Sequence, residues 1–172
     1  PKKTTCQWYQ GDAELKDETG DELVFKARKD DNGKKYKCKV SNEAGETISS
    51  PAQLSVHYIE IDDDNLADKT VTVGASITFE ISAKGNPSVK YKWLKVGSSK
   101  TYSTKNSLKI SNTDKNHEGQ YYCEVYNGFA DSKTSKKVAL TVNLEKPRII
   151  EHPSPEEQAV EVGTKVTFKI KA

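Results

Sequence analysis

Cysteine, histidine and aspartate side chains could do chemistry in this chain, but their spacing limits what kind. Cys6, Cys38 and Cys123 lie far apart, so none of them forms a CxxC redox or zinc pair. The three histidines are as widely separated and lack the spacing of a metal site. The acidic run Asp62 to Asp64 would need further ligands to bind calcium, and a solvated loop is the simpler interpretation. We therefore expect no catalytic site, no metal and no other cofactor, and the chain is not predicted to be an enzyme.

Composition excludes two further classes of partner. The 172 residues are 34% hydrophobic and 30% charged, with a net charge of only +2, which gives no overall attraction to nucleic acid. No apolar run approaches the roughly 18 residues of a membrane helix. We expect no nucleic-acid partner and no membrane segment. Residue 1 is a proline and not an initiator methionine, so we expect a piece of a longer protein.

A repeat organises the chain. The stretch KYKWLK at 90–95 matches TCQWYQ at 5–10, and YYCEVYNGFADS at 121–132 matches YKCKVSNEAGET at 36–47, both at an offset of 85 residues. The stretch GASITFEISA at 74–83 matches GTKVTFKIKA at 163–172, at an offset of 89. One unit of about 85 to 90 residues therefore recurs, as in repeat architectures.

The pattern inside the unit is that of short β-strands. Ile77, Phe79 and Ile81 alternate with polar residues, and the stretches VKYKW, SLKIS and KKVALTV alternate likewise. Turn residues such as GNP and NTDKN separate these runs. Seven short strands in a unit predict an all-β sandwich of two sheets.

One set of residues makes the fold more specific. Gly85-Asn86-Pro87, then Trp93, then the series Gly119, Tyr121, Cys123, Val125 and Asn127 at alternate positions resembles an I-set immunoglobulin domain. The resemblance implies that Trp93 is the core residue of strand C and that Tyr121 forms the tyrosine corner. In the first unit Gly33 precedes Tyr36 by three residues and not two, so that corner is expected to be distorted.

The resemblance divides the chain into one complete domain and two partial ones. Residues 1–57 supply strands C to G, residues 58–143 form a whole domain, and residues 144–172 supply strands A and B. Two explanations stay open: an arbitrary slice of a longer array, or strands A and B of one molecule completing strands C to G of the next in a head-to-tail fibre.

The resemblance also raises the question of a disulfide. Counting back 12 residues from Trp93, the family's usual distance between strands B and C, leads to Ile81, and the last unit has Ile170 there. Cys123 therefore has no partner, and we expect the same for Cys38. A Cys6–Cys38 bond stays open because strands C and F are neighbours, but a buried free thiol is the preferred interpretation.

The predicted fold class is accordingly a tandem of I-set immunoglobulin-like sandwiches free of disulfides. Isoleucine in place of cysteine suits a reducing compartment, as do the odd cysteine count and the lack of a usable N-x-S/T sequon. We expect a cytoplasmic protein of the sarcomere or cytoskeleton. The predicted core signature is Trp8, Cys38, Ile81, Trp93, Tyr121, Cys123 and Ile170.

Strand parity predicts a surface for a partner. If Trp93, Cys123 and Val138 point inward, the residues between them point out of the sheet formed by strands C, F and G. Lysines beside exposed tyrosines suit an acidic protein surface, although outward lysines also simply keep sheets soluble. The candidate partner face consists of Lys90, Lys92, Tyr122, Glu124, Tyr126, Lys133 and Lys137. The first unit is expected to have a similar surface, with lysines beside a tyrosine: Lys35, Lys37, Lys39 and Tyr9.

The chain looks most like the I-set arrays of muscle giants related to titin, twitchin, projectin and stretchin, above all in VSNEAGE at 40–46. That resemblance implies a sarcomeric scaffold, thick-filament-associated or elastic. Its partners would be neighbouring immunoglobulin domains head to tail and acidic filament surfaces such as myosin. One alternative is the ectodomain of an extracellular adhesion protein or receptor. Another is a set of docking modules of an intracellular signalling enzyme, either kinase or paracaspase-like, because EVYNGFADSKTSKK somewhat resembles paracaspases.

Overall fold

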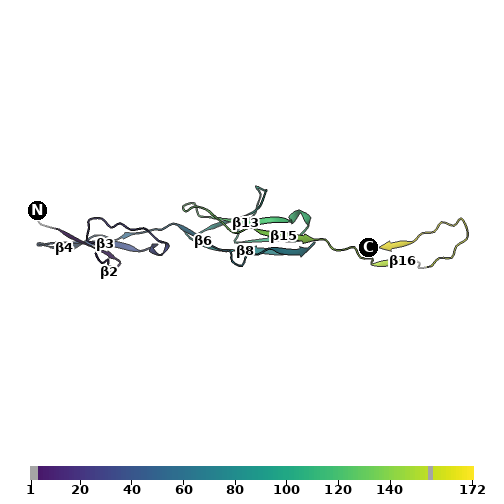
Figure 1. The fold of residues 1–172 in the computed structure, drawn as a ribbon, viewed down its shortest axis with the longest axis horizontal. Helices are drawn as coiled ribbons and strands as arrows, with labels where there is room; N and C mark the ends of the chain where they lie inside the picture. Colours follow the sequence, from purple (N-terminus) through teal and green to yellow (C-terminus); the bar gives the residue numbers. More distant parts are fainter. Residues whose placement is uncertain (1–3, 155–156) are drawn as a thin grey trace.

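The computed structural model describes residues 4–154 and 157–172 and shows an elongated molecule whose parts follow one another in a row (Figure 1). An N-terminal unit, a middle domain and a C-terminal segment lie along the long axis. The predicted boundaries fall between β5 and β6 and directly after β15. Among the described residues, no helix has both the length and the apolar character needed to cross a membrane. The described helices include two short 3-10 turns, η1 (Lys29–Asp31) and η2 (Lys115–His117).

The N-terminal unit is a single antiparallel sheet. Its strands follow the order β2-β1-β3-β4, and β5 also pairs with β3. No second sheet covers it among the described residues, so Cys38 is the one described side chain of this unit that is buried. The strands are β1 (Thr5–Gln10), β2 (Ala13–Glu14), β3 (Lys35–Asn42), β4 (Gly45–Ile48) and β5 (Ala52–Gln53).

The middle domain is a sandwich whose larger layer has the order β11-β10-β13-β15-β7, with β14 also pairing with β13. All neighbours are antiparallel except β15 and β7, which are parallel. These strands are β7 (Lys69–Thr72), β10 (Lys90–Lys95), β11 (Thr101–Ser103), β13 (Gly119–Tyr126), β14 (Lys133–Thr134) and β15 (Val138–Asn143).

The opposite layer of the middle domain consists of two strand pairs. β6 pairs with β9 and β8 pairs with β12, both antiparallel. β8 and β9 are the two halves of one long stretch interrupted at Ile81. The strands are β6 (Tyr58–Asp62), β8 (Ile77–Glu80), β9 (Ser82–Asn86) and β12 (Ser107–Ile110). An all-β sandwich is therefore confirmed for this domain.

Alternating apolar residues of both layers meet in one core. Phe79 from β8 packs against Trp93 of β10, with ring centroids 6.3 Å apart, and against Tyr121 of β13, at 5.9 Å. The Tyr121 hydroxyl donates a 2.8 Å hydrogen bond to the carbonyl of His117, four residues upstream, which is the geometry of a tyrosine corner. In the first unit Tyr36 instead contacts the Phe25 ring, with centroids 5.1 Å apart.

The C-terminal segment is a lone strand pair. β16 (Glu151–Ser154) and β17 (Lys169–Lys171) are antiparallel, with Glu151 opposite Lys171. Its described side chains are exposed, because no described layer packs on them.

The expectation of a disulfide-free fold is wrong, because Cys6 and Cys38 form a disulfide bond. In the register of β1 and β3, Trp8 lies opposite Cys38 and Cys6 lies opposite Val40. The two cysteines are thus diagonal neighbours on one face, with Cα atoms 6.4 Å apart, a distance that a disulfide spans. The sequence argument left this bond between the adjacent strands C and F open but preferred a buried free thiol, because it started from the family's pairing between strands B and F. Cys123 is free and buried.

Candidate interaction face

The register of β10 and β13 places the predicted partner residues side by side. Lys90 lies opposite Tyr126, and Lys92 lies opposite Glu124. One step further, Tyr122 lies opposite Leu94. Because Trp93 and its neighbours on β13 point into the core, these residues form the outer surface of the sheet. We call Lys90, Lys92, Tyr122, Glu124 and Tyr126 the lysine–tyrosine face.

A shallow hollow lies on this face. Its volume is about 410 Å³, and it is lined by Lys92, Glu124, Tyr126, Thr101 and Thr104. The two threonines come from β11 and the turn that follows it, and sequence reasoning missed them. The strand is only three residues long and has no clear alternation, so its pattern offered little signal. Hydroxyl groups beside an ammonium and a phenol make the hollow a mixed polar surface suited to a protein partner.

The lysines of this face are not tied up in ion pairs within the described part of the chain, although Glu124 lies opposite Lys92. Within the described residues, neither Lys90 nor Lys92 forms an ion pair. The equivalent surface of the N-terminal unit differs, because Lys37 is 2.9 Å from an Asp12 carboxylate oxygen and Lys39 is 3.2 Å from a Glu46 oxygen. The ammonium groups of the middle domain are therefore the more available to the carboxylates of a partner.

Two further predicted residues lie at the margin of the face. Lys133 lies opposite Val125 and not opposite Glu124, so its parity is that of the inward residues, although its side chain is exposed. The reason is an irregularity after Ser135, whose hydroxyl accepts the Cys123 N–H at 2.9 Å. Lys137 directly precedes β15, is exposed and follows the outer parity of that strand. The structure thus brings five of the predicted residues together and sets Lys133 apart from them.

The predicted core residues lie in three different environments. Ile81, Trp93, Tyr121 and Cys123 are buried in one cluster of the middle domain, and Cys38 is buried in the N-terminal unit. The counterparts of Trp93 and Ile81 in the partial units are more exposed: Trp8 is half-buried, and Ile170 is 58% exposed.

Burial also suppresses the chemistry of the free thiol. Desolvation raises the pKa of Cys123 to about 11, so the group stays a neutral thiol near pH 7 and is a poor nucleophile. Desolvation likewise raises the pKa of Tyr121 to about 12.

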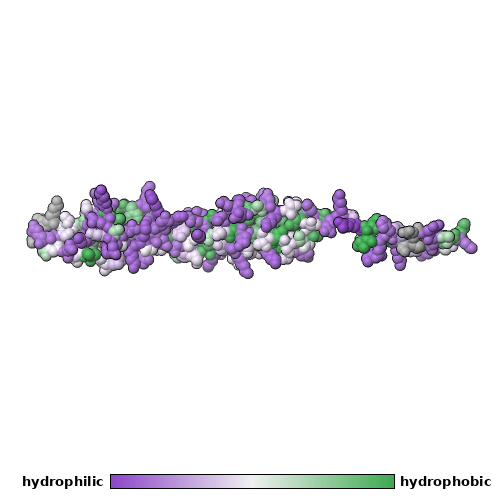
Figure 2. Space-filling model, turned by 90° about the horizontal axis from the view of Figure 1, so that it is seen from below, coloured by the Kyte–Doolittle hydropathy of each residue, from purple (hydrophilic) through white to green (hydrophobic). Residues whose placement is uncertain are grey.

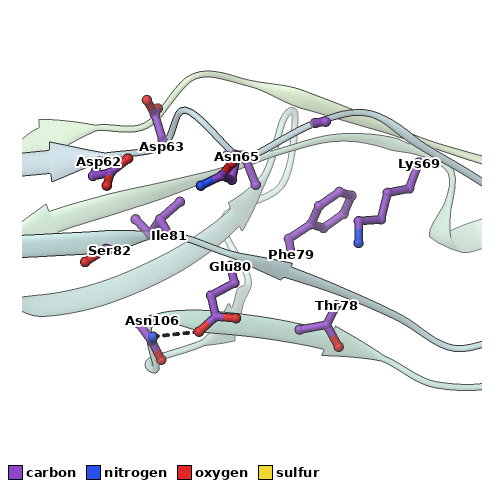
Figure 3. A pocket seen from close by; sticks show the side chains of 12 residues that line it. Asp62, Asp63, Asn65, Lys69, Thr78, Phe79, Glu80, Ile81, Ser82 and Asn106 are labelled. Carbon is purple, nitrogen blue, oxygen red and sulfur yellow. Dashed lines mark hydrogen bonds between the residues drawn. The ribbon is translucent and has the colours of Figure 1, made fainter.

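The acidic run lies at the edge of a second hollow, of about 480 Å³, shown in Figure 3. Here Asp63 accepts a hydrogen bond from the backbone N–H of Lys136. Glu80 accepts one at 3.1 Å from the Asn106 amide. Asp63 thereby holds the corner between β6 and β7 to the segment before β15, whereas Glu80 joins β8 to the turn before β12. The described residues contain no group of three or more histidine, cysteine, aspartate or glutamate side chains placed to hold a metal ion.

The junction between the N-terminal unit and the middle domain holds a polar cluster that sequence reasoning missed. The Asn86 amide donates to the Asn32 side-chain oxygen at 2.9 Å and to the Val56 carbonyl at 2.9 Å. The same Asn32 oxygen accepts the Val56 N–H at 3.0 Å. We call Asn32, Val56 and Asn86 the asparagine latch. The Gly85-Asn86-Pro87 motif pointed to one member, but nothing in the sequence pairs it with Asn32.

Comparison with known proteins finds similarity to proteins with immunoglobulin domains. Residues 61–127 match the family model "Immunoglobulin domain". The chain is 29% identical to the mouse (Mus musculus) mucosa-associated lymphoid tissue lymphoma translocation protein 1 homolog over 79% of its length. It is 26% identical over 86% of its length to the muscle M-line assembly protein unc-89 of Caenorhabditis elegans, and 25% identical over 77% to the cell adhesion molecule DSCAM of Gallus gallus. The chain spans only 18%, 2% and 7% of these three relatives.

Solved structures show the same fold. The first two immunoglobulin domains of DIP-gamma superpose with a TM-score of 0.61 at 19% identity, covering 81% of this chain and 83% of that one. The titin I-band fragment I67–I69 superposes with a TM-score of 0.57 at 23% identity, covering 82% of this chain and 56% of that one. The middle of the chain therefore has the immunoglobulin-like fold, and the proteins that the chain resembles include both a muscle protein and a cell-adhesion molecule.

Proposed function

We propose that the chain is a non-catalytic rod segment of a tandem-immunoglobulin protein and that it binds an acidic protein surface through the lysine–tyrosine face. The observation that carries the proposal is a pair of lysines, Lys90 and Lys92, that lie opposite Tyr126 and Glu124 and form no ion pair among the described residues. In such a face the tyrosine rings provide contact area with the partner, and the lysine charges orient an acidic partner as it binds. The comparisons give no support to myosin, so we define the partner by its charge alone.

Charge reversal on the face tests this proposal. Lys90→Glu with Lys92→Glu should weaken binding to a synthetic poly-glutamate peptide at least about tenfold, because repulsion replaces attraction. Titration calorimetry at low and physiological salt measures the effect. The matched control, Lys84→Glu with Lys109→Glu, changes the net charge equally with exposed lysines of the opposite layer. Equal losses in both variants would mean that net charge, and not this face, carries the binding.

The first candidate setting is an intracellular scaffold of the sarcomere. It is supported by Ile81 in the buried core beside the free thiol of Cys123, since a domain without this disulfide suits a reducing compartment. The likeness to the muscle M-line assembly protein unc-89 points the same way.

The second candidate setting is the ectodomain of a cell-adhesion protein. The Cys6–Cys38 disulfide supports it, because disulfides persist in oxidising compartments. Because the N-terminal unit contains this bond, the absence of a disulfide can no longer be used to place that unit in a reducing compartment. The likeness to the cell adhesion molecule DSCAM is in keeping with it.

The thiol state of the protein from its natural source decides between the two settings. Mass spectrometry after alkylation without reductant should find Cys6 and Cys38 linked if the protein is extracellular, and both alkylated after unfolding if it is intracellular. Cys123 provides the internal control, because it is free in the structure and is alkylated on unfolding in either setting.

A further inference from the structure

Two asparagines of the chain, Asn32 and Asn127, are directly followed by glycine. An Asn-Gly pair can react with itself, because the backbone nitrogen of the glycine attacks the side-chain carbonyl carbon of the asparagine. A carbon–nitrogen bond forms, ammonia leaves, and the product is a cyclic imide. Water then opens the ring at one of its two carbonyls and gives aspartate or isoaspartate. Glycine favours the attack because it has no Cβ to obstruct the approach of its nitrogen.

Both pairs lie where the N-terminal unit meets the middle domain. Asn32 belongs to the asparagine latch, in which its side-chain oxygen accepts hydrogen bonds from Asn86 and Val56. Asn127 lies in the loop after β13 and binds the carbonyl of the same Asn86. The glycine of each pair is exposed, and the side chains over this stretch of the rod are mostly hydrophilic (purple) on the face that Figure 2 shows. Water for the hydrolysis therefore reaches both pairs.

The fold binds the Asn127 amide at both ends. Its nitrogen donates to three carbonyls, those of Tyr58 at 3.3 Å, Asn86 at 3.2 Å and Pro87 at 3.2 Å. Its oxygen accepts the backbone N–H groups of Phe129 at 3.1 Å and Ala130 at 3.0 Å. Ring closure expels the nitrogen that forms three of these hydrogen bonds, so the fold opposes the reaction while the loop is closed.

An aspartate does not fit the place of this amide. Its carboxylate only accepts hydrogen bonds, so it would face three carbonyl oxygens without a proton to donate. The loop would then lose its attachment to β6 and β9. The contact that this loop makes through Phe129 with His57, which directly precedes β6, would be weakened as well; the two ring centroids are 4.7 Å apart.

Asn32 differs from Asn127 in the atom that carries its hydrogen bonds. The bonds that the structure shows at the Asn32 side chain are accepted by its oxygen. Ring closure at Asn32 therefore does not give up three donated bonds, and a carboxylate at residue 32 would supply the same acceptor to Asn86 and Val56. The two Asn-Gly pairs thus share one chemistry, but only one of them is protected by the fold.

We propose that Asn127 is a deamidation site whose reactivity is controlled by the fold. The site is protected while its amide holds the loop after β13, and it reacts with the Gly128 nitrogen once the loop opens. The aspartate or isoaspartate that results keeps the loop detached. A transient opening of the loop thereby leaves a lasting chemical change that loosens the junction between the two units.

Peptide mapping by mass spectrometry tests the site. The whole chain is incubated in mildly alkaline buffer, once folded and once in urea, and conversion at residues 32 and 127 is followed over time. Asn127 should react at least about tenfold more slowly in the folded chain than in urea, because its amide must first give up several hydrogen bonds. Asn32 is exposed and should be slowed less. Equal rates for Asn127 in the two conditions would overturn the control by the fold.

A change of the glycine tests the chemistry itself. In urea, where the backbone of the loop is unrestrained, Gly128→Ala should slow the conversion of Asn127, because the added Cβ obstructs the attacking nitrogen. The conversion of Asn32 in the same molecule should be unchanged and is the internal control. An undiminished rate at Asn127, or no conversion of Asn127 in the unchanged chain in urea, would overturn the site.

Asn127→Asp tests the consequence, because it installs one product without the reaction. Small-angle X-ray scattering should show a broader distribution of distances between the two units than in the unchanged chain. Asn32→Asp is the matched control: it adds the same charge at the same junction but keeps the acceptor of the latch, so its distribution should stay narrow. Equal broadening in both variants, or none in Asn127→Asp, would overturn the effect on the junction.

The fluorescence of Trp93, which is fully buried, shows in a Trp8→Phe background whether the middle domain of each variant is folded. A folded middle domain with a broadened distance distribution is the expected result for Asn127→Asp. Loss of the folded signal would instead assign the Asn127 amide to the stability of the whole domain and overturn its proposed role at the junction.

Discussion

At the scale of single residues, the core of the middle domain shows how one aliphatic side chain substitutes for a covalent bond. Ile81 and Cys123 belong to the same buried cluster and have 3% and 0% exposed surface. The spacing from Trp93 predicted this substitution, because core positions recur at fixed distances along the repeat. The same spacing could not reveal the Cys6–Cys38 bond, which depends on the register of two adjacent strands.

Ile81→Cys should restore the missing bond. Under oxidising conditions a disulfide between the introduced thiol and Cys123 is expected to stabilise the middle domain by about 2–4 kcal/mol relative to the reduced variant. Urea unfolding with and without reductant measures the difference, with Trp93 fluorescence as the signal in a Trp8→Phe background. Ile81→Ala is the control: it loses about 2–5 kcal/mol of packing in both conditions. A variant that stays reduced under oxidant would show that the two side chains do not face each other.

The buried thiol and phenol also predict how stability depends on pH. The pKa of Cys123 is raised to about 11 and that of Tyr121 to about 12, so the folded state holds both protons more tightly than the unfolded state. Their stabilisation is complete below the unfolded pKa values, 9.0 and 10.0, and is lost as pH rises toward the folded values. We expect each group to reduce the free energy of unfolding by about 1.4 kcal/mol per pH unit in its window.

Urea unfolding at pH 8, 9, 10 and 11, chosen as roughly unit steps across the two windows, measures this slope. Cys123→Val should remove the part that begins at pH 9.0 and leave the part due to Tyr121. A slope that is the same in the variant would rule out the thiol as its source.

At the scale of elements, contacts between loops decide how neighbouring units are held. The asparagine latch joins the turn after η1 to the end of β9, and the rings of His57 and Phe129 lie 4.7 Å apart beside it. Asn127 fixes the loop after β13 by donating to the carbonyls of Asn86 and Pro87, both at 3.2 Å. The partners in the latch come from loops whose proximity only the fold establishes.

Asn86→Ala should loosen this junction. It removes the bonds to Asn32 and Val56, each worth about 1 kcal/mol net, and should widen the distribution of angles between the two units. NMR relaxation and small-angle X-ray scattering would show this as separate tumbling of the units and a broader distance distribution. Asn106→Ala, which removes a bond inside the middle domain, should leave the junction unchanged. An unaltered distance distribution in Asn86→Ala would assign the stiffness to the linker itself.

At the scale of the whole molecule, alternation along single strands indicated which residues of β10 and β13 point out of the sheet, whereas the expectation that these strands are neighbours came from the resemblance to the immunoglobulin fold. Lys133 lies outside that face because an irregularity after Ser135 shifts its parity, and alternation alone does not reveal a bulge. Thr101 and Thr104 line the hollow but could not be predicted, because β11 and the turn after it are too short to show an alternating pattern. The predicted and observed members of the face thus differ where the position of a residue depends on a neighbouring strand.

The parallel pairing of β7 with β15 determines how the middle domain responds to tension. The chain enters the domain through β6, which pairs with β9, continues into β7 and leaves the domain directly after β15. Force applied at the two ends of the rod would therefore draw these parallel strands in opposite directions along their length. The paired residues, from Leu140 with Lys69 to Asn143 with Thr72, would be sheared at the same moment and could not unzip one after another. The domain should accordingly resist stretching along the rod axis more strongly than peeling from the side.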